Sequence, residues 1–360
     1  MPSSTNGGSV SDEPTRLETV VAKIFAAQSQ VAPLRVSDTA TVQLLEGADG
    51  QDDCAVFRMS GEQDLVVGSD YVRGPKFRLY EFGLLDEYDL GYYLAAANLS
   101  DIAAMGASPI GLLSVVRYPP QMTDAEFASV LLGIKDACRN FGTSNIGGDI
   151  GGAERLILSA AALGVCRPGQ SLLRRGAKPG DHLFLTGPTG IAGAAMQYLT
   201  SDVTLATIDA HFRGRLLAAW KRPQARVREG IYLGNSGLAT SCQDTSDGLK
   251  AAIESLGDAS GVGFRIEREC LLIADEVSAV CRHLNLDAVT TVMGDSVDFE
   301  LLFTVPERHV DTLETTAAKN GFTFSRLGVA TAAREFVLCH PDGTTTGLPG
   351  SGWRHAPDPP

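Results

Sequence analysis

The sequence predicts an α/β (α+β) protein of two domains, and three observations support this prediction. The chain has 360 residues, enough for two domains at roughly 100–200 residues each. Strand-like and helix-like apolar patterns alternate along both halves of the chain. A turn-rich stretch at Gly176–Asp181 separates the halves. The expected division is a leader and N-terminal helix over 1–30, an N-terminal domain over 31–177, a C-terminal domain over 178–340 and a tail over 341–360.

In the first half, apolar spacing and capping residues predict each element in turn. Asp70 stands at the end of a predicted buried strand, and Asp89 is expected to cap a long helix. Thr123 is expected to cap a second helix, with Glu126 in the capping-box position. The expected elements are a leader over 1–15, a helix over 17–28, a strand over 65–70, a helix to 106, a strand over 110–116, a helix to about 141 and a strand over 156–165.

The second half repeats this alternation. The expected elements are a strand over 182–186, a helix from about 191, a helix starting at 247–249, a strand over 299–305 and a tail over 341–360 with few regular elements. The segment Gly187–Gly190 follows a strand and opens a helix, so it either binds phosphate or forms a plain βα turn. The sequence has no P-loop, no G-x-S-x-G motif and no metal spacing among its histidines, so nucleophilic or zinc hydrolysis has no support.

Composition and charge narrow the class of function. Hydrophobic residues make up 44% of the chain and charged residues 20%, as in an ordinary globular protein. The formal net charge of −13 disfavours a general electrostatic grip on nucleic acid or on an anionic membrane. No apolar run approaches the length of a membrane span, and the N-terminus lacks an apolar signal core. Seven scattered cysteines without a C-x-x-C pair fit a reducing cytoplasm.

The most informative feature is a set of aspartates beside Gly or Ser, most of them at predicted strand ends. Asp101 differs because it lies inside a predicted helix, three residues after Asn98 and therefore on the same face. That helix is otherwise apolar, so its polar residues are expected to face something specific. The aspartates are Asp52 with Asp53, Asp70, Asp101, Asp149, and Asp244 with Asp247.

Clustered carboxylates favour metal ions. Several carboxylates at one place repel one another unless cations lie between them. Mg²⁺ takes oxygen ligands and commonly bridges carboxylates to substrate phosphates. Glycines such as Gly148 and Gly248 allow backbone and phosphate to approach closely. The pattern therefore indicates several Mg²⁺ ions holding a nucleoside triphosphate, whereas each aspartate alone would be read as a turn or cap residue.

These segments, in this order, resemble thiamine-monophosphate kinase, of the superfamily shared with aminoimidazole ribonucleotide synthetase. The resemblance covers about residues 30–335. It rests on Gly50-Gln-Asp-Asp-Cys-Ala-Val56, the Ser69-Asp70 pair, the block Asn98–Pro109, Ile146-Gly-Gly-Asp149, Arg174–Asp181, Asp244-Thr-Ser-Asp-Gly-Leu249 and Asp298–Pro306. It implies a PurM-like fold of two α/β domains, a homodimer formed through the N-terminal domain, and ATP with several Mg²⁺ ions in a cleft.

The resemblance also implies roles for individual residues. Gly148, Asp149, Arg174 and Ser246 would contact the nucleotide, and the expected catalytic set is Asp149, Arg174 and Asp247. The implied Mg²⁺ ligands are Asp53, Ser69, Asp70, Asp101, Asp149, Asp244 and Asp247. Gly68 replaces a ligand position that is usually Ser or Thr, although a backbone carbonyl can still bind the ion.

The acceptor side departs further from the family pattern. Lys76 lies near the position where the family has a substrate-binding His. Val297 stands where the family has a Glu that contacts the substrate, and Asp295 could take over the role of that Glu. Ile150 and Gly151 stand where the family has Thr-Thr, and Trp353 is the candidate for the aromatic residue that stacks on the substrate ring. The residues expected to bind metal and phosphate thus match the family pattern, whereas those expected to recognise the acceptor differ from it.

Three functions remain open at the level of sequence. The first is Mg²⁺-dependent phosphoryl transfer from ATP to a small phosphate acceptor, thiamine phosphate or a relative of it. The second is a synthetase that activates an amide or carboxyl oxygen with ATP in a specialised pathway. The third is an ATP-binding protein without catalysis. The preserved aspartates argue against the third, because clustered carboxylates without a use are destabilising.

Overall fold

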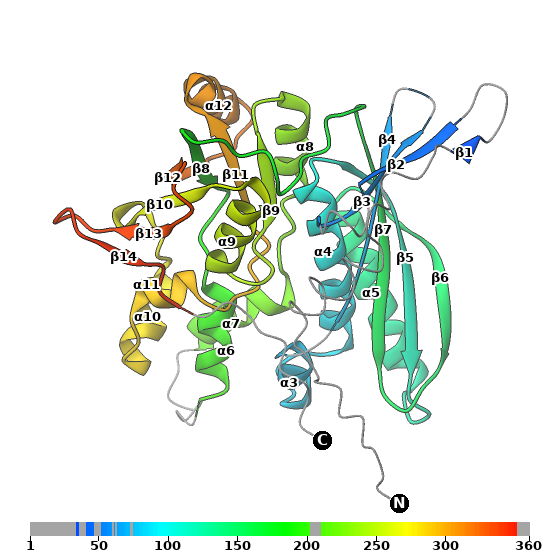
Figure 1. Cartoon of the computed structure of the whole chain (residues 1–360). Coiled ribbons are helices and arrows are strands. Elements are labelled where there is room, and N and C mark those ends of the chain that lie inside the picture. Colours follow the sequence, from blue (N-terminus) through cyan, green and yellow to red (C-terminus); the bar gives the residue numbers. More distant parts are fainter. Residues whose placement is uncertain are drawn as a thin grey trace, which may run out of the picture.

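The computed structural model describes residues 34–35, 41–46, 52–59, 61, 63–72, 75–201 and 210–350, with the backbone alone at 34–35, 75–77 and 210. It contains two seven-stranded sheets, one from each half of the chain, with helix α4 between them (Figure 1). The predicted helix over 17–28 and Trp353 lie outside the described residues. Among the described helices, none combines the length and the apolar character that a membrane crossing requires.

The first sheet has the strand order β1-β2-β3-β4-β7-β5-β6, and only β5 and β6 run parallel within it. The predicted strands over 65–70, 110–116 and 156–165 are confirmed as β4, β5 and β7, each with slightly different bounds. The strands are β1 (Leu34–Arg35), β2 (Thr41–Glu46), β3 (Ala55–Met59), β4 (Asp64–Tyr71), β5 (Ser108–Tyr118), β6 (Asn145–Gly152) and β7 (Ile157–Cys166).

Helices α3 (Pro75–Glu81), α4 (Glu87–Ala104) and α5 (Asp124–Asn140) belong to the first half. The capping box of Thr123 and Glu126 on α5 is confirmed. The prediction that Asp89 caps α4 is wrong. Asp86 is the N-cap: its side chain accepts from the amide of Asp89, and the Asp89 side chain accepts from the amide of Asp86. Aspartates stand at both positions of this box, so residue type alone cannot tell the cap from its partner.

The second sheet has the strand order β14-β13-β10-β12-β8-β11-β9, with β10 and β13 as its one parallel pair. Its interior strands β8 and β11 are buried along their whole length, and most of their residues are apolar. The strands are β8 (Asp181–Leu185), β9 (Ser241–Asp244), β10 (Gly263–Glu267), β11 (Leu301–Pro306), β12 (Ser325–Thr331), β13 (Phe336–Cys339) and β14 (Thr345–Gly347).

The helices of the second half are α6 (Ile191–Leu199), α7 (Ala210–Lys221), α8 (Val227–Ser236), α9 (Leu249–Ser260), α10 (Asp275–Leu284), α11 (Ala288–Met293) and α12 (Val310–Lys319). The predicted helices from about 191 and from 247–249 are confirmed as α6 and α9. The predicted strand over 299–305 begins two residues later, at Leu301, because Phe299 takes a left-handed φ of 55°. The tail retains one short strand, β14, paired with β13.

Helix α4 holds the two halves together. Most of its residues are buried because it packs on β4 and β7 on one side and on α8 and β9 on the other. Near the N-terminus of α4, the Asp89 carboxylate lies 2.9 Å from Nζ of Lys221, the last residue of α7, and accepts from Arg222, the residue after it, at 2.6 Å. The Arg222 guanidinium also stacks over the ring of Tyr88. The polar residues of α4 are therefore fixed relative to both sheets.

Candidate metal and nucleotide site

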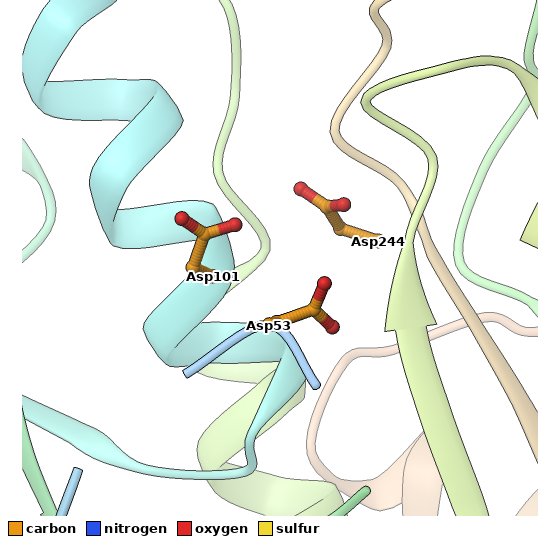
Figure 2. A group of neighbouring side chains, drawn as sticks. All are labelled: Asp53, Asp101 and Asp244. Atoms are coloured by element: carbon orange, nitrogen blue, oxygen red, sulfur yellow. The ribbon is translucent and has the colours of Figure 1, made fainter. Parts of the chain in front are cut away.

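Three carboxylates from distant parts of the chain meet where the two halves join. Asp53 precedes β3, Asp101 lies on α4, and Asp244 ends β9. One carboxylate oxygen from each lies within 4.8 Å of the others, and Figure 2 shows the side chains converging. We call this group the carboxylate cluster. Because two members come from the first half and one from the second, the cluster forms only when the halves are packed together.

The surroundings of the cluster disfavour three negative charges. Burial, and then the charges of Asp244 and Asp53, raise the pKa of Asp101 well above its ordinary value. Burial, and then the charge of Asp53, raise the pKa of Asp244 to about 7. A cation between the carboxylates would reverse this balance. The donor atoms are all oxygens, and Oδ2 of Asp53 is buried without a hydrogen-bond partner among the described residues. The cluster therefore fits a hard divalent cation such as Mg²⁺.

Arg174 lies at the edge of the cluster, where its guanidinium pairs with the Asp53 carboxylate. Its backbone amide donates to the Asp52 carboxylate at 3.1 Å, which ties the loop of Arg174 to the loop of Asp53. Burial, and then the charge of Asp53, raise the pKa of Asp52 to about 7. Within the described part of the chain, Nε of Arg174 is buried and has no acceptor. One N–H donor of the guanidinium is thus left unused by the described residues and is available to a ligand.

Polar residues of α4 hold the neighbouring segments in place. Ser100 donates to Asp244 Oδ2 at 2.6 Å, and Asn98 Oδ1 accepts from the amide of Asp70 at 2.9 Å. Ser246 donates to the other oxygen of Asp244 at 2.8 Å. The role of Ser100 is not predicted by sequence reasoning, although a polar residue on an otherwise apolar helix is the signal that could have shown it.

A second group of predicted site residues lies apart from the cluster, on the face of the first sheet that α4 and α5 leave open. A groove of about 710 Å³ there is lined by Ser69, Asp70, Tyr71, Leu113, Val115, Gly148, Asp149, Ser159, Ala160 and Ala161. Asp70 connects the two groups, because it lines the groove and its charge also contributes to the raised pKa of Asp101. The described residues thus form one acidic zone that runs from the cluster to the groove.

The expectation that Asp149 follows the end of a strand is wrong. Asp149 lies in the middle of β6, an exposed strand at the edge of the sheet. Its side chain is 65% exposed and accepts from Arg117 at 2.6 Å, and this contact lowers its pKa. The neighbouring Gly148 has no room for a side chain, since an added Cβ would lie 1.7 Å from the carbonyl oxygen of Ser114.

Residues 244–248 and 295–298 come together on the second half. Burial, and then the charge of Asp247, raise the pKa of Asp295 to about 6. Gly248, at a φ of +92°, packs its Cα against the carbonyl of Gly294. The loop of Asp295 therefore packs against the segment that contains Asp247.

The segment Gly187–Gly190 forms a plain βα turn, and the alternative interpretation as a phosphate site finds no support. The carboxylate of Asp298 accepts from the amides of Gly190 at 2.6 Å and Ala192 at 3.0 Å. Ser296 accepts from the next amide, that of Gly193, at 2.9 Å. The N-terminus of α6 is thus occupied by the chain's own side chains, which leaves no free amides there for an anion.

Two predicted acceptor residues are only partly described. The backbone of Lys76 belongs to α3, and its side chain lies outside the description. Trp353 also lies outside it, but Gly350, three residues earlier, packs on the Cα of Gly294. Lys250 fixes this end of the chain by donating to the Gly350 carbonyl at 2.8 Å. The C-terminal segment is therefore held next to the loop of Asp295.

Comparison with known proteins gives concordant matches for both halves. The family model "AIR synthase related protein, N-terminal domain" matches residues 51–166, and "AIR synthase related protein, C-terminal domain" matches residues 178–340. The chain is 31% identical over 309 residues to thiamine-monophosphate kinase of Escherichia coli K12, covering 86% of this chain and 91% of that protein. It is 28% identical over 309 residues to thiamine-monophosphate kinase of Bacillus subtilis, and the match covers 84% of this chain and 92% of that protein.

Solved structures agree on the fold. AaThiL complexed with AMPPCP and TMP superposes with a TM-score of 0.72 at 22% identity, covering 85% of this chain and 91% of that one. Thiamine-monophosphate kinase from Stenotrophomonas maltophilia gives a TM-score of 0.70 at 26% identity, covering 86% and 93%. A HypE–HypF complex gives 0.67 at 15% identity, covering 92% and 99%. These likenesses extend over both sheets.

Proposed function

Because the chain belongs to the AIR synthase related family, with thiamine-monophosphate kinases as relatives over most of its length, we propose that it is an ATP-dependent kinase of thiamine phosphate. The reaction is ATP + thiamine phosphate → ADP + thiamine diphosphate. The observation that supports it best is the carboxylate cluster, which brings Asp53, Asp101 and Asp244 together from both halves. A buried site of this charge suits metal-assisted phosphoryl transfer.

Mg²⁺ ions would be held by the carboxylate cluster and by Ser69, Asp70, Asp149 and Asp247. When bound, they would neutralise the triphosphate and hold donor and acceptor in line. Arg174 contributes the donors of its guanidinium to phosphate, and its loop is kept in place by Asp52. Gly148 and Ser246 present backbone and hydroxyl groups to the nucleotide. An acceptor that is already a phosphate needs no general base, so positioning and charge screening are the tasks left to these residues.

The acceptor pocket would include Lys76, Asp295 and Trp353. The loop of Asp295 packs against the segment that contains Asp247, and the segment that leads to Trp353 is held against the same loop by Lys250. Val297, where the family pattern has an acid, packs partly buried against the hydrophobic core. We therefore propose Asp295 as the acid of this pocket, in a slightly shifted loop, with an acceptor that resembles thiamine phosphate or equals it.

We further propose a cytoplasmic homodimer with the domain boundary near residue 177. On the open face of the first sheet, beyond the residues that line the groove, β7 exposes the large apolar side chain of Ile157, which a second copy would cover. Light scattering on the eluted protein is expected to give twice the chain mass. Ile157→Asp, at a position that is 39% exposed here, is expected to give the monomer, and a monomeric wild-type protein would contradict the proposal.

The function is tested by phosphorus NMR of the protein with Mg²⁺, ATP and thiamine phosphate, followed over time. The expected result is a growing thiamine diphosphate signal together with ADP, and none when Mg²⁺ is replaced by EDTA. ATP binding without any product would mean that the nucleotide part of the site works with a different acceptor. Release of inorganic phosphate only in the presence of an amine and a carboxylate or amide would point instead to a synthetase.

A further inference from the structure

Arg117 forms an ion pair with Asp149 that no assigned role explains. The two residues lie on neighbouring parallel strands, where Val115 faces Asp149 and Arg117 faces Gly151 in the register. Because side chains alternate along a strand, Arg117, Asp149 and the groove residue Val115 share the open face of the sheet. Arg117 Nη2 lies 2.6 Å from Asp149 Oδ2. The guanidinium thus stands at the border of the groove described above.

The backbone leaves a space for this guanidinium. Gly151 has no side chain, and a Cβ added there would lie 2.9 Å from Arg117 Nη1. The described residues that line the groove include two acids, Asp70 and Asp149, but no lysine or arginine. Arg117 therefore brings a cation to the border of an acidic groove, where Asp149, one of the groove's own acids, holds it.

Stability does not account for the pair. The Arg117 side chain is 34% exposed and that of Asp149 65% exposed, and an exposed pair of this kind contributes about 0–1 kcal/mol. The pair instead changes the charge of the groove, because it neutralises Asp149, one of the two acids that line the groove. A cation bound at Asp149 would displace the guanidinium, which would then lie free within reach of whatever the cation carries.

We propose that Arg117 is a phosphate-binding residue that exchanges partners when the metal–nucleotide complex binds. Asp149 then turns to the divalent cation, and the guanidinium turns from the carboxylate to phosphate oxygens of the nucleotide. A guanidinium suits both partners, since its planar fork pairs equally with carboxylate and phosphate. This inference rests on the proposed function, because it requires a metal–nucleotide complex in the groove. It adds to that function a residue outside the implied ligand set.

The exchange predicts two effects of opposite sign in Arg117→Ala. Without nucleotide, Asp149 loses a competing cation, so Mn²⁺ used as the probe is expected to bind several-fold more tightly. With Mg²⁺ and AMPPCP, a non-hydrolysable ATP analogue, the loss of a charge-assisted contact is expected to weaken nucleotide binding about tenfold to hundredfold. A residue with a purely structural role would move both affinities in the same direction or neither. Arg117→Lys is expected to lie between the wild type and Arg117→Ala.

Isothermal titration of the full chain measures both affinities. Arg139→Ala is the matched control, since Arg139 is an exposed arginine paired with Asp136 on α5, and it is expected to bind like the wild type. Gly151→Ala supplies a second variant that pushes the guanidinium away without removing it, and it should weaken nucleotide binding as well. Equal nucleotide affinity in Arg117→Ala and wild type, or a parallel loss of Mn²⁺ affinity, overturns the exchange. A wild-type protein that binds no Mg²⁺·AMPPCP would refute the proposed function instead.

Discussion

Asp101→Asn is expected to lower Mg²⁺-dependent turnover by about a hundredfold to a thousandfold, the scale for removing one preorganised electrostatic group. Asparagine keeps the size and one oxygen of the side chain but removes its charge. Asp101 faces Asp53 and Asp244 in the cluster, and α4 holds it rigidly between the sheets. The nearby polar residues of α4 cannot replace it, because Asn98 and Ser100 carry no charge and already form hydrogen bonds with Asp70 and Asp244. A steady-state assay with thiamine phosphate measures the loss.

The same substitution is expected to stabilise the metal-free protein. Burial and neighbouring acids raise the pKa of Asp101, and burial and Asp53 raise that of Asp244 to about 7. An acid whose pKa is higher in the folded than in the unfolded state makes the folded state bind more protons, so stability falls as pH rises from about 4 to about 7. In EDTA the wild-type melting temperature should therefore fall across this window, and Asp101→Asn should flatten the fall. Mg²⁺ should restore stability to the wild type more than to the variant.

Asp258→Asn provides the control for this experiment. It removes one aspartate from an exposed position on α9, without any expected change in activity or in the effect of Mg²⁺. Full Mg²⁺-dependent activity in Asp101→Asn would refute the assignment of the cluster as the metal site. A melting temperature in EDTA that drops in the variant would show that the carboxylate contributes to folding by contacts of its own.

The sequence was sufficient to predict strands β4, β5, β7, β8 and β11, helices α4, α5, α6 and α9, and the three members of the carboxylate cluster, whereas the other elements were not predicted. Acids beside small residues, at strand ends or on an apolar helix, are rare enough to stand out, and they carried the metal interpretation. Asp149 was found, but its place was wrong, because the glycine-rich, exposed strand β6 has no apolar alternation to reveal it. The N-cap of α4 was displaced by three residues for a different reason: both positions of its capping box are aspartates.

Side-chain contacts between residues far apart in the sequence could not be predicted from the sequence. Arg117 and Asp149 are 32 positions apart and meet only through the register of a parallel pair that includes a bulge. Ser100 and Asp244 are 144 positions apart and meet only because α4 packs against the second sheet. Local patterns determine secondary structure, whereas such pairings depend on how the two sheets are placed around α4. That placement depends in turn on glycines whose role becomes visible only in three dimensions.

Two such glycines lie where α4 and α5 cross, and Gly133→Ala is expected to have the largest effect on stability of any substitution considered. A Cβ at Gly133 would lie 2.0 Å from the carbonyl oxygen of Tyr88, and one at Gly91 would lie 2.1 Å from that of Val130. Backbone rather than a movable side chain stands in the way, so the helices must separate. Overpacking of this kind costs about 1–3 kcal/mol or more.

The direction of the change in stability distinguishes overpacking at the helix crossing from an effect of helix propensity. In an unobstructed helix, Gly→Ala stabilises by about 0.8–1.0 kcal/mol. Gly214 on α7 is such a site, because nothing lies within 4 Å of its added Cβ, so Gly214→Ala is the matched control and should raise the urea midpoint. Gly133→Ala should lower it and should also reduce turnover, since separation of α4 from α5 displaces Asn98 and Asp101 together. A midpoint for Gly133→Ala at or above the wild-type value would show that the crossing relaxes without cost, and that the position of α4 is set by its contacts with the second sheet instead.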